Sequence, residues 1–178
     1  IWKIIDVQVE GDRLGQKLLR VHLYHVMVCF SPHNVGMDAR ITARGLHGES
    51  YRGHIFWDEL FILPLYNAHF PGVTKAALRY RYNRLEAARK YAEAHGYKGA
   101  MFPWQSGSDG REETQVVHLN PLTGKWGADY SSFQRHVSLA IAYNTWQYVH
   151  MTNDTDYLAE QGAEMFLDIC RFWASMAT

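Results

Sequence analysis

Residues 132–151, with the sequence SFQRHVSLAIAYNTWQYVHM, carry apolar side chains almost all round a helix. A helix of this kind is covered on every side, so the stretch predicts an inner helix of an all-α fold. The segment after the turn TNDTD differs, because Asp154 is placed to cap a helix whose apolar face lies opposite Glu160, Glu164 and Asp168. An inner helix followed by a one-sided helix predicts two layers of helices.

Three more helices are predicted upstream of this pair. Residues 14–30 carry apolar side chains on two sides and are expected to be covered on both, residues 57–69 begin close to two acidic residues, and residues 73–95 are rich in helix formers. A short N-terminal strand, ended by Gly11 and Asp12, is predicted from the alternation of three apolar residues: Ile5, Val7 and Val9.

The connections between these helices are alternately short and long. Five helices in inner and outer layers predict an α/α toroid, in which the long loops gather at one end of the inner helices and form a pocket. The two long connections are residues 31–57 and residues 97–131, and the second is expected to be irregular because it is rich in glycine and proline.

Composition limits the location and the partners of the chain. Its 178 residues suit one domain with a large core, and 18 Lys and Arg balance 18 Asp and Glu, so neither nucleic acid nor an anionic membrane surface is expected as a partner. No apolar run reaches the length of a bilayer and no targeting signal is recognised. Cys29 and Cys170 lie in apolar stretches and are expected to be buried thiols in a reducing compartment, which predicts a cytoplasmic location.

A pair of carboxylates lies between aromatic residues in the stretch GHIFWDELF, residues 53–61. A buried carboxylate needs a partner, so this pair is either a structural device at a helix start or a polar ligand site. The arrangement suits a sugar, whose ring offers an apolar face to an aromatic side chain and hydroxyl groups to a carboxylate. From these residues alone, Trp57 and Asp58 are more often a core anchor beside a helix-start charge.

Other polar residues of the two long loops also leave two interpretations open. Trp104 either contacts a ligand or plugs the loop, and Arg52 and His54 either bind pocket carboxylates or satisfy loop carbonyls. The stretch SGSDGREE either supplies acid and base groups or is a solvated loop, and its acidic residues are Asp109, Glu112 and Glu113.

Neither a metal site nor a nucleotide site is predicted. His22, His25 and Cys29 recur at helical spacing, but Pro32 ends the helix before His33 can join their face, so no metal is assigned. The glycine-rich runs lack the spacing of phosphate-binding loops.

Three stretches follow one another along the chain as consecutive signatures: ARGLHGESYRGHIFWDE (residues 43–59), LRYRYNRLEAARKYAEAHGYKGAMFPWQSGSDGREE (78–113) and QRHVSLAIAYNTWQY (134–148). They resemble glycoside hydrolase family 65, the inverting maltose, kojibiose and trehalose phosphorylases and related hydrolases. The resemblance implies a partial (α/α)6 toroid, with residues 1–178 a single domain that is a fragment of the barrel catalytic domain. The chain departs from the family pattern at Glu59, where WDTE is shortened, at Gln105 of PWQS, and at Gln134 and Ala140.

The resemblance also implies the chemistry: inverting cleavage of an α-glucosyl disaccharide, with inorganic phosphate as co-substrate and no other cofactor. One carboxylic acid protonates the leaving oxygen while phosphate attacks the opposite face of the sugar. In the family the acid and the phosphate loop come from later inner helices, so no catalytic residue is assigned in this chain, and the fallback candidates are Glu59, Glu112 and Glu113. The substrate-binding residues that the resemblance implies or leaves open are Trp57, Asp58, Trp104, Arg52 and His54.

Two alternatives stay open: an inverting hydrolase of the same family, and a non-catalytic carbohydrate-binding or scaffolding module. The expected partners are the disaccharide and the missing C-terminal part of the chain's own barrel. Because five helices do not close the ring, Leu139, Tyr143 and Trp146 are expected to be left partly uncovered, and the isolated chain is expected to form homo-oligomers or aggregates through exposed helix faces.

Overall fold

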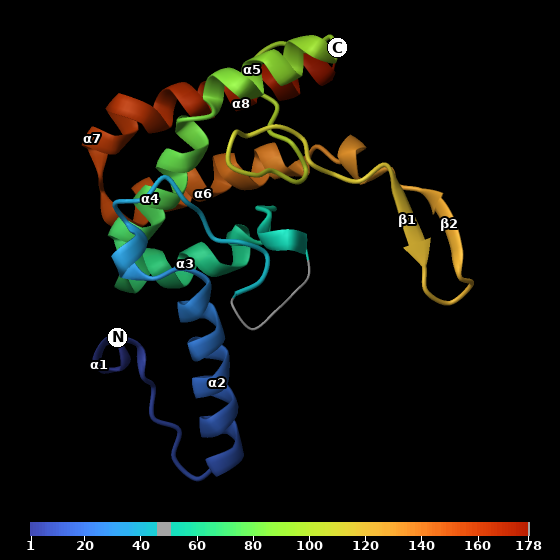
Figure 1. Cartoon of the computed structure of the whole chain (residues 1–178). Helices are drawn as coiled ribbons and strands as arrows, with labels where there is room; N and C mark the ends of the chain where they lie inside the picture. The colour runs from blue at the N-terminus through green and yellow to red at the C-terminus, as the bar shows by residue number, and fades with distance from the viewer. Residues whose placement is uncertain (46–50, 178) are drawn as a thin grey trace.

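Two helices, α3 (Glu59–His69) and α6 (His136–Thr152), pack against each other and run in the same direction (Figure 1). Helix α4 (Pro71–Tyr82) packs against both of them, and α8 (Ala163–Met176) packs against α6. This arrangement gives the two predicted layers, with α3 and α6 inside and α4 and α8 outside. The fold is mostly helical and corresponds to part of an α/α barrel.

The structure is a computed structural model that describes residues 1–45 and 51–177. None of the helices in this described part of the chain has the length and apolarity needed to cross a membrane. Three short 3₁₀ turns lie in the loops: η1 (Pro32–Asn34), η2 (Tyr51–Gly53) and η3 (Ser131–Phe133).

Helix α6 is covered on one side only. Val137 and Ile141 on its inner side are buried with residues of α5 and α8. The opposite side carries three large side chains that are about half exposed: Leu139 (50%), Tyr143 (47%) and Trp146 (51%). The prediction that this helix is covered all round is therefore wrong for the described part of the chain. The prediction that these three residues are left uncovered is confirmed.

The helix predicted over residues 73–95 is divided into α4 and α5 (Leu85–Ala94). The chain turns at Arg84, whose guanidinium donates to the carbonyl oxygen of Ser108 at 2.9 Å and to the carboxylate of Asp38 at 2.9 Å. These contacts come from distant parts of the chain. Local helix propensity could not predict the break, because it is stabilised by tertiary contacts.

The predicted N-terminal strand is absent from the described structure. Helix α1 (Trp2–Ile5) occupies its beginning, and Val7 and Val9 lie exposed in an extended segment. The side chain of Gln16 accepts from the amide of Val9 at 2.7 Å and donates to the carbonyl of Val7 at 3.0 Å. A side chain thus supplies the hydrogen bonds that a second strand would have supplied.

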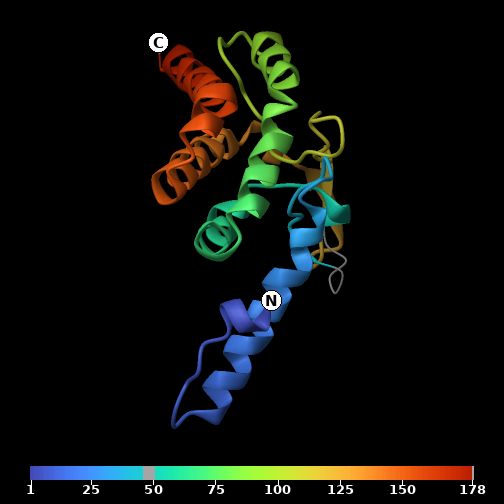
Figure 2. The ribbon, with the colours of Figure 1, turned by 90° about the vertical axis from the view of Figure 1, so that its left-hand side faces the viewer.

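Helix α2 (Arg13–Cys29) extends away from the other helices (Figure 2). Asp12 caps its first turn, and only Met27 is buried among its residues. The hydroxyl of Tyr66 donates to the carbonyl of Phe30 at 2.7 Å and anchors the C-terminal end of α2 on α3. The prediction that this helix is covered on both sides is therefore wrong within the described structure.

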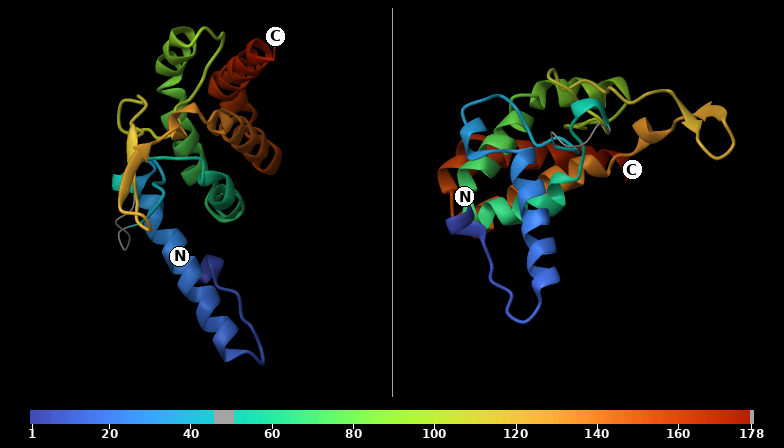
Figure 3. Two further views of the ribbon diagram at one scale, coloured as in Figure 1. Left: turned by 90° about the vertical axis from the view of Figure 1, so that its right-hand side faces the viewer. Right: turned by 60° about the horizontal axis from the view of Figure 1, so that its bottom comes forward.

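A β-hairpin interrupts the long connection at residues 97–131. Its strands β1 (Val117–Asn120) and β2 (Lys125–Ala128) pair antiparallel, and all their residues are exposed. The hairpin projects from the helices (Figures 1 and 3). The prediction of a wholly irregular connection is wrong at this point, because the glycine and proline residues include those of the turn between two strands.

The chain from Asp154 onward forms α7 (Thr155–Tyr157), a π-helical turn η4 (Leu158–Gly162) and α8. The carboxylate of Asp154 accepts from the amide of Tyr157 at 3.0 Å, which confirms the predicted cap. The prediction that Asp168 faces water is wrong, because its side chain is buried and paired with two arginines. Arg89 of α5 lies 2.5 Å away and joins α8 to α5, and Arg171 of α8 itself lies 2.5 Å away.

The two cysteines are free thiols, as predicted, but they are not both buried. Cys29 is half-buried and Cys170 is exposed. Burial raises the pKa of the Cys29 thiol. Cys170 follows a buried isoleucine on α8, and one step along a helix turns a side chain by about 100°, which places it towards solvent.

Candidate functional site

The two long loops meet at the N-terminal ends of α3 and α6, as predicted. Ile55 and Ser106 form a two-residue antiparallel bridge, with N–O distances of 2.9 Å and 3.1 Å. Arg52 adds a contact by donating to the carbonyl oxygen of Glu113 at 3.2 Å. The bridge brings the stretch that contains Trp57 next to the stretch that contains Trp104.

Trp57 and Trp104 both contact one ring, the imidazole of His136. The ring centroids of Trp57 and His136 are 5.0 Å apart, and those of Trp104 and His136 are 5.1 Å apart, both in edge-to-face geometry. His136 is the first residue of α6, and nothing in the local sequence distinguished it from a core histidine. His136 was therefore not among the predicted site residues, and its place between the two indoles follows only from where α6 begins.

An apolar groove of about 490 Å³ starts at Trp57 and His136 and continues between α3 and α6. Its two ends differ in character, since the imidazole lies at one end and the half-exposed side chain of Tyr143 lies farther along α6. The other lining residues come from both helices: Leu60, Phe61, Pro64, Leu139, Ala140 and Gln147.

Asp58 faces a different hollow from Trp57. It is exposed and makes no side-chain cap for α3. Its hollow, of about 470 Å³, is shared with Arg44, Tyr51 and His22. Consecutive residues at this helix start thus point to two sides, so the structure does not bring Trp57 and Asp58 together in one recess.

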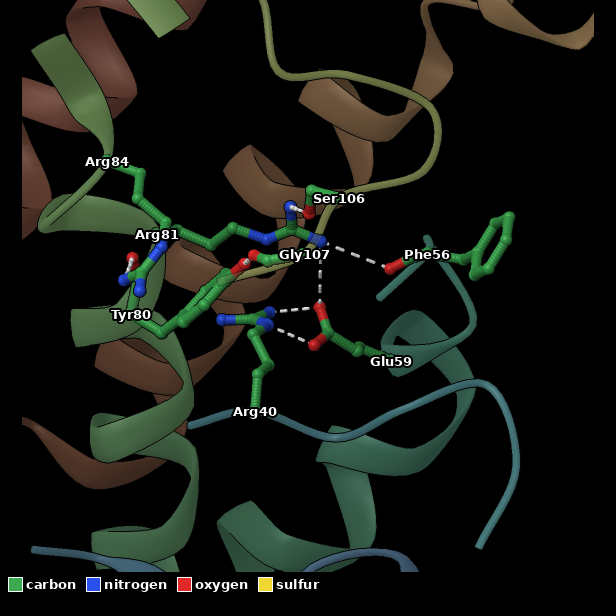
Figure 4. Close-up of polar contacts among 8 residues, drawn as sticks. All are labelled: Arg40, Phe56, Glu59, Tyr80, Arg81, Arg84, Ser106 and Gly107. Carbon is green, nitrogen blue, oxygen red and sulfur yellow. Dashed lines mark hydrogen bonds and ion pairs between the residues drawn. The ribbon is translucent and has the colours of Figure 1, made fainter. Parts of the chain in front are cut away.

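Glu59 is buried between two arginines (Figure 4). Arg40 donates from two nitrogens to its two carboxylate oxygens, and Arg81 lies 3.5 Å from one of them. Burial lowers the pKa of Arg81 to about 10, although Glu59 opposes the shift. Both carboxylate oxygens of Glu59 are thus engaged by arginine donors, so neither is free to protonate a leaving oxygen.

The C-terminal end of α4 holds the loop that follows Trp104 (Figure 4). Arg81 donates to the Ser106 hydroxyl at 3.3 Å and to the Phe56 carbonyl at 3.2 Å. The hydroxyl of Tyr80 donates to the carbonyl of Gly107. Two side chains of α4, Tyr80 and Arg81, therefore hold the loop at Ser106 and Gly107 in place.

Glu112 organises the same loop from the other side. Its carboxylate accepts from the backbone amides of Trp104 at 2.7 Å, Gln105 at 3.1 Å and Thr114 at 3.0 Å. A carboxylate with three amide donors stabilises a loop conformation. Glu112 of the stretch SGSDGREE therefore has a structural role in the loop and is not simply a solvated side chain.

The remaining candidate residues lie at the edge of this loop cluster. Glu113 is 39% exposed, with its carboxylate 4.0 Å from Arg111. A ring nitrogen of His54 lies 3.0 Å from the carbonyl oxygen of Tyr51. A third hollow, of about 770 Å³, is lined by residues that include Arg52, Trp104, Gln105 and Asp129.

No group of three or more His, Cys, Asp or Glu residues that could hold a metal ion exists in the described ranges 1–45 and 51–177. His22, His25 and Cys29 lie beside the hollow of Asp58 and do not form such a group.

Residues 20–178 match the model of the glycosyl hydrolase family 65 central catalytic domain. The chain belongs to glycosyl hydrolase family 65. It is 44% identical, over 99% of its length, to the trehalose 6-phosphate phosphorylase of Lactococcus lactis. It is also 40% identical, over 96% of its length, to the kojibiose hydrolase of Flavobacterium johnsoniae.

A solved structure described as a "putative kojibiose phosphorylase from human microbiome" has the same fold. It superposes with a TM-score of 0.80 at 28% identity, over 98% of this family 65 chain. The chain spans 23% of the length of each of the two curated relatives and 21% of the solved chain. The family assignment confirms the predicted resemblance and makes the chain part of a carbohydrate-active enzyme family.

Proposed function

We propose that this chain supplies the sugar-binding part of an enzyme that cleaves an α-glucosyl disaccharide with inorganic phosphate. The observation that carries the proposal is the aromatic cluster at the N-terminal ends of α3 and α6, where Trp57 and Trp104 meet at His136. Indole rings can stack on the apolar face of a pyranose, and the polar groups of the surrounding loops can bind its hydroxyls.

In this proposal Trp57 flanks the glucosyl ring, and the carboxylate of Asp58 accepts hydroxyl hydrogen bonds. Asp58 has no capping bond to its own helix that would compete with this role. Because Asp58 faces the neighbouring hollow, the sugar would have to reach across the start of α3 to touch both residues. Arg52, His54 and Trp104 are proposed as further contacts on the loop side.

The catalytic acid and the phosphate site are proposed to lie outside residues 1–178. Two of the fallback acids already have other roles, since Glu59 is an ion-pair partner and Glu112 accepts three backbone amides. Glu113 is the least committed of the three, because its carboxylate is partly exposed at the loop edge. Phosphate is the only co-substrate the proposal requires.

Hydrolysis is the second candidate reaction, because one relative is named as a kojibiose hydrolase. The two reactions share protonation of the leaving oxygen and differ in whether phosphate or water attacks. The third candidate is a carbohydrate-binding module without turnover, because the aromatic cluster of Trp57, Trp104 and His136 could bind a sugar without any catalytic group.

The test is a substrate panel assayed on the full-length protein with and without inorganic phosphate. Kojibiose, maltose, nigerose, trehalose and trehalose 6-phosphate are each incubated, and glucose and glucose 1-phosphate are quantified. We expect glucose 1-phosphate to form in a phosphate-dependent way from at least one of them. Glucose release that ignores phosphate would establish the hydrolase, and binding without any product would establish the module.

The residue-level test is Asp58→Asn in the full-length protein. Loss of a charge-assisted hydrogen bond to a sugar hydroxyl is expected to weaken transition-state stabilisation by about 2–4 kcal/mol. Asp109→Asn is the matched control, since Asp109 is an exposed loop carboxylate paired with Arg111. Unchanged kcat/KM in Asp58→Asn would mean that this residue only marks a helix start.

A further inference from the structure

The positions of Trp57 and Trp104 depend on two short backbone segments. Trp57 follows Phe56, and Trp104 precedes Ser106 by two residues. The bridge between Ile55 and Ser106 joins these segments by two backbone hydrogen bonds, and the rings of Phe56 and Trp104 meet edge to face with their centroids 5.6 Å apart. Further side-chain contacts set how the two segments lie relative to each other.

Arg81 reaches both segments at once (Figure 4). One end nitrogen donates to the Phe56 carbonyl at 3.2 Å, and the other donates to the Ser106 hydroxyl at 3.3 Å. The side chain is 2% exposed and lies on α4, which packs against both inner helices. Burial excludes water as a substitute donor, so these two contacts depend on the guanidinium itself.

Charge balance alone does not explain why a second arginine is buried here. Arg40 already binds both carboxylate oxygens of Glu59, so the carboxylate is neutralised without Arg81. The cluster has surplus donors: Nη1 of Arg40 and Nε of Arg81 have no acceptor among the described residues. An additional buried cation is costly, and its contacts with the two loop segments offset that cost.

We propose that Arg81 is a positioning residue that sets the separation and tilt of Trp57 and Trp104 around His136. The proposal rests on the proposed sugar-binding role of the two tryptophans. Arg81 has no contact with the sugar in this scheme. It acts through the Phe56 carbonyl and the Ser106 hydroxyl, and a planar guanidinium is suited to the task because its donors diverge at fixed angles.

The test compares Arg81→Met, Arg81→Lys and Arg89→Met in the full-length protein. Arg81→Met leaves Glu59 paired with Arg40, and Arg89→Met leaves Asp168 paired with Arg171, so each variant keeps a paired buried carboxylate. Kinetic constants, the near-ultraviolet circular dichroism of the unliganded protein and the thermal midpoint are measured for each.

We expect Arg81→Met to lose roughly 10- to 100-fold in kcat/KM, because displacements of about 1 Å at a site have effects of this size. Its near-ultraviolet spectrum should change, since the edge-to-face rings around His136 move. Arg89→Met should lose thermal stability but keep both the spectrum and the kinetic constants. Arg81→Lys should recover part of the activity, because an ammonium reaches one acceptor but not both.

Wild-type kinetic constants and an unchanged spectrum in Arg81→Met would overturn the proposal and leave Arg81 a purely structural residue. If Arg81→Met does not fold, Ser106→Ala removes one contact while keeping the charge, and a several-fold loss of kcat/KM with an altered spectrum is expected. If the wild-type protein neither binds nor cleaves any disaccharide, the proposed function fails, while the spectra still decide whether Arg81 sets the ring geometry.

Discussion

Replacing Glu59 by glutamine tests whether the buried carboxylate is structural or catalytic. Glu59→Gln keeps the size of the side chain and removes its charge, which leaves Arg40 and Arg81 as two unpaired cations. The exposed fractions of the three side chains are 3% for Glu59, 0% for Arg40 and 2% for Arg81. Water therefore cannot replace the missing partner.

The size of the effect follows from this burial. Removing one partner of a buried ion pair costs about 3–5 kcal/mol, because the other charge remains buried and uncompensated. The amide oxygen of glutamine still accepts one N–H bond, worth roughly 1 kcal/mol. The expected loss in the free energy of unfolding is therefore about 3 kcal/mol, and the thermal midpoint falls with it.

The assay is thermal unfolding of the full-length protein, with Glu113→Gln as the control. Glu113 is 39% exposed and its carboxylate is 4.0 Å from Arg111, so its change should lower the midpoint by no more than about 2 °C. The double variant Glu59→Gln, Arg81→Met should be more stable than the sum of the single variants predicts, because it removes one of the two unpaired cations. A Glu59→Gln protein with a wild-type midpoint and lost turnover would refute the structural assignment and make Glu59 the acid.

Three further predictions concern other parts of the chain. The pKa of Asp154 is lowered to about 2, chiefly by a hydrogen bond from Lys75, so the stability that its carboxylate contributes is present above pH 4 and is lost as the pH falls through 2. The free energy of unfolding of Asp154→Asn should be lower than that of wild type by roughly 1 kcal/mol at pH 5, and the two values should converge near pH 2. A difference that stays constant from pH 5 to pH 2 would contradict this. Gly99→Ala should strongly lower the thermal midpoint, because Gly99 has φ +73° and a Cβ there would lie 2.1 Å from a backbone oxygen of α8. Gly36→Ala is the control, since a Cβ at Gly36 meets no atom within 4 Å. Equal midpoints for the two variants would contradict the close packing of Gly99 on α8. Residues 1–178 alone should associate through the open face of α6, and Leu139→Lys with Tyr143→Glu should reduce the mass measured by light scattering; a monodisperse wild-type monomer would contradict the exposed face.

Much of the helical layout could be predicted from the sequence. The sequence placed α2, α3 and α6 within a few residues of their bounds, and Asp154 marked the start of the last helical segment, which the structure divides into α7, η4 and α8. The break between α4 and α5 could not be predicted, because Arg84 is held there by a carboxylate and a carbonyl from loops far away in the sequence.

Burial was predicted less well than helix type. Asp168 looked like a solvent-facing residue, yet it is buried beneath two arginines that pair with it. Residues 14–30 looked two-sided, yet most of α2 is exposed in the described structure. The pattern of apolar residues predicts which faces of a helix should be buried, but the tertiary structure determines which other elements pack against them.

For the candidate site, the sequence by itself determined the residue types and the two loops that carry them. Trp57 and Asp58 stand out because a carboxylate among aromatic rings needs a partner if it is buried, and Trp104 stands out as an indole within the second long loop. The tertiary structure alone decided that Trp57 and Asp58 face different hollows, that Glu59 is committed to Arg40, and that His136 lies between the two indoles. The physical reason is that covalent neighbours are fixed by the chain, whereas the separation between side chains distant in sequence is set only when the inner helices pack and bring their N-terminal ends together.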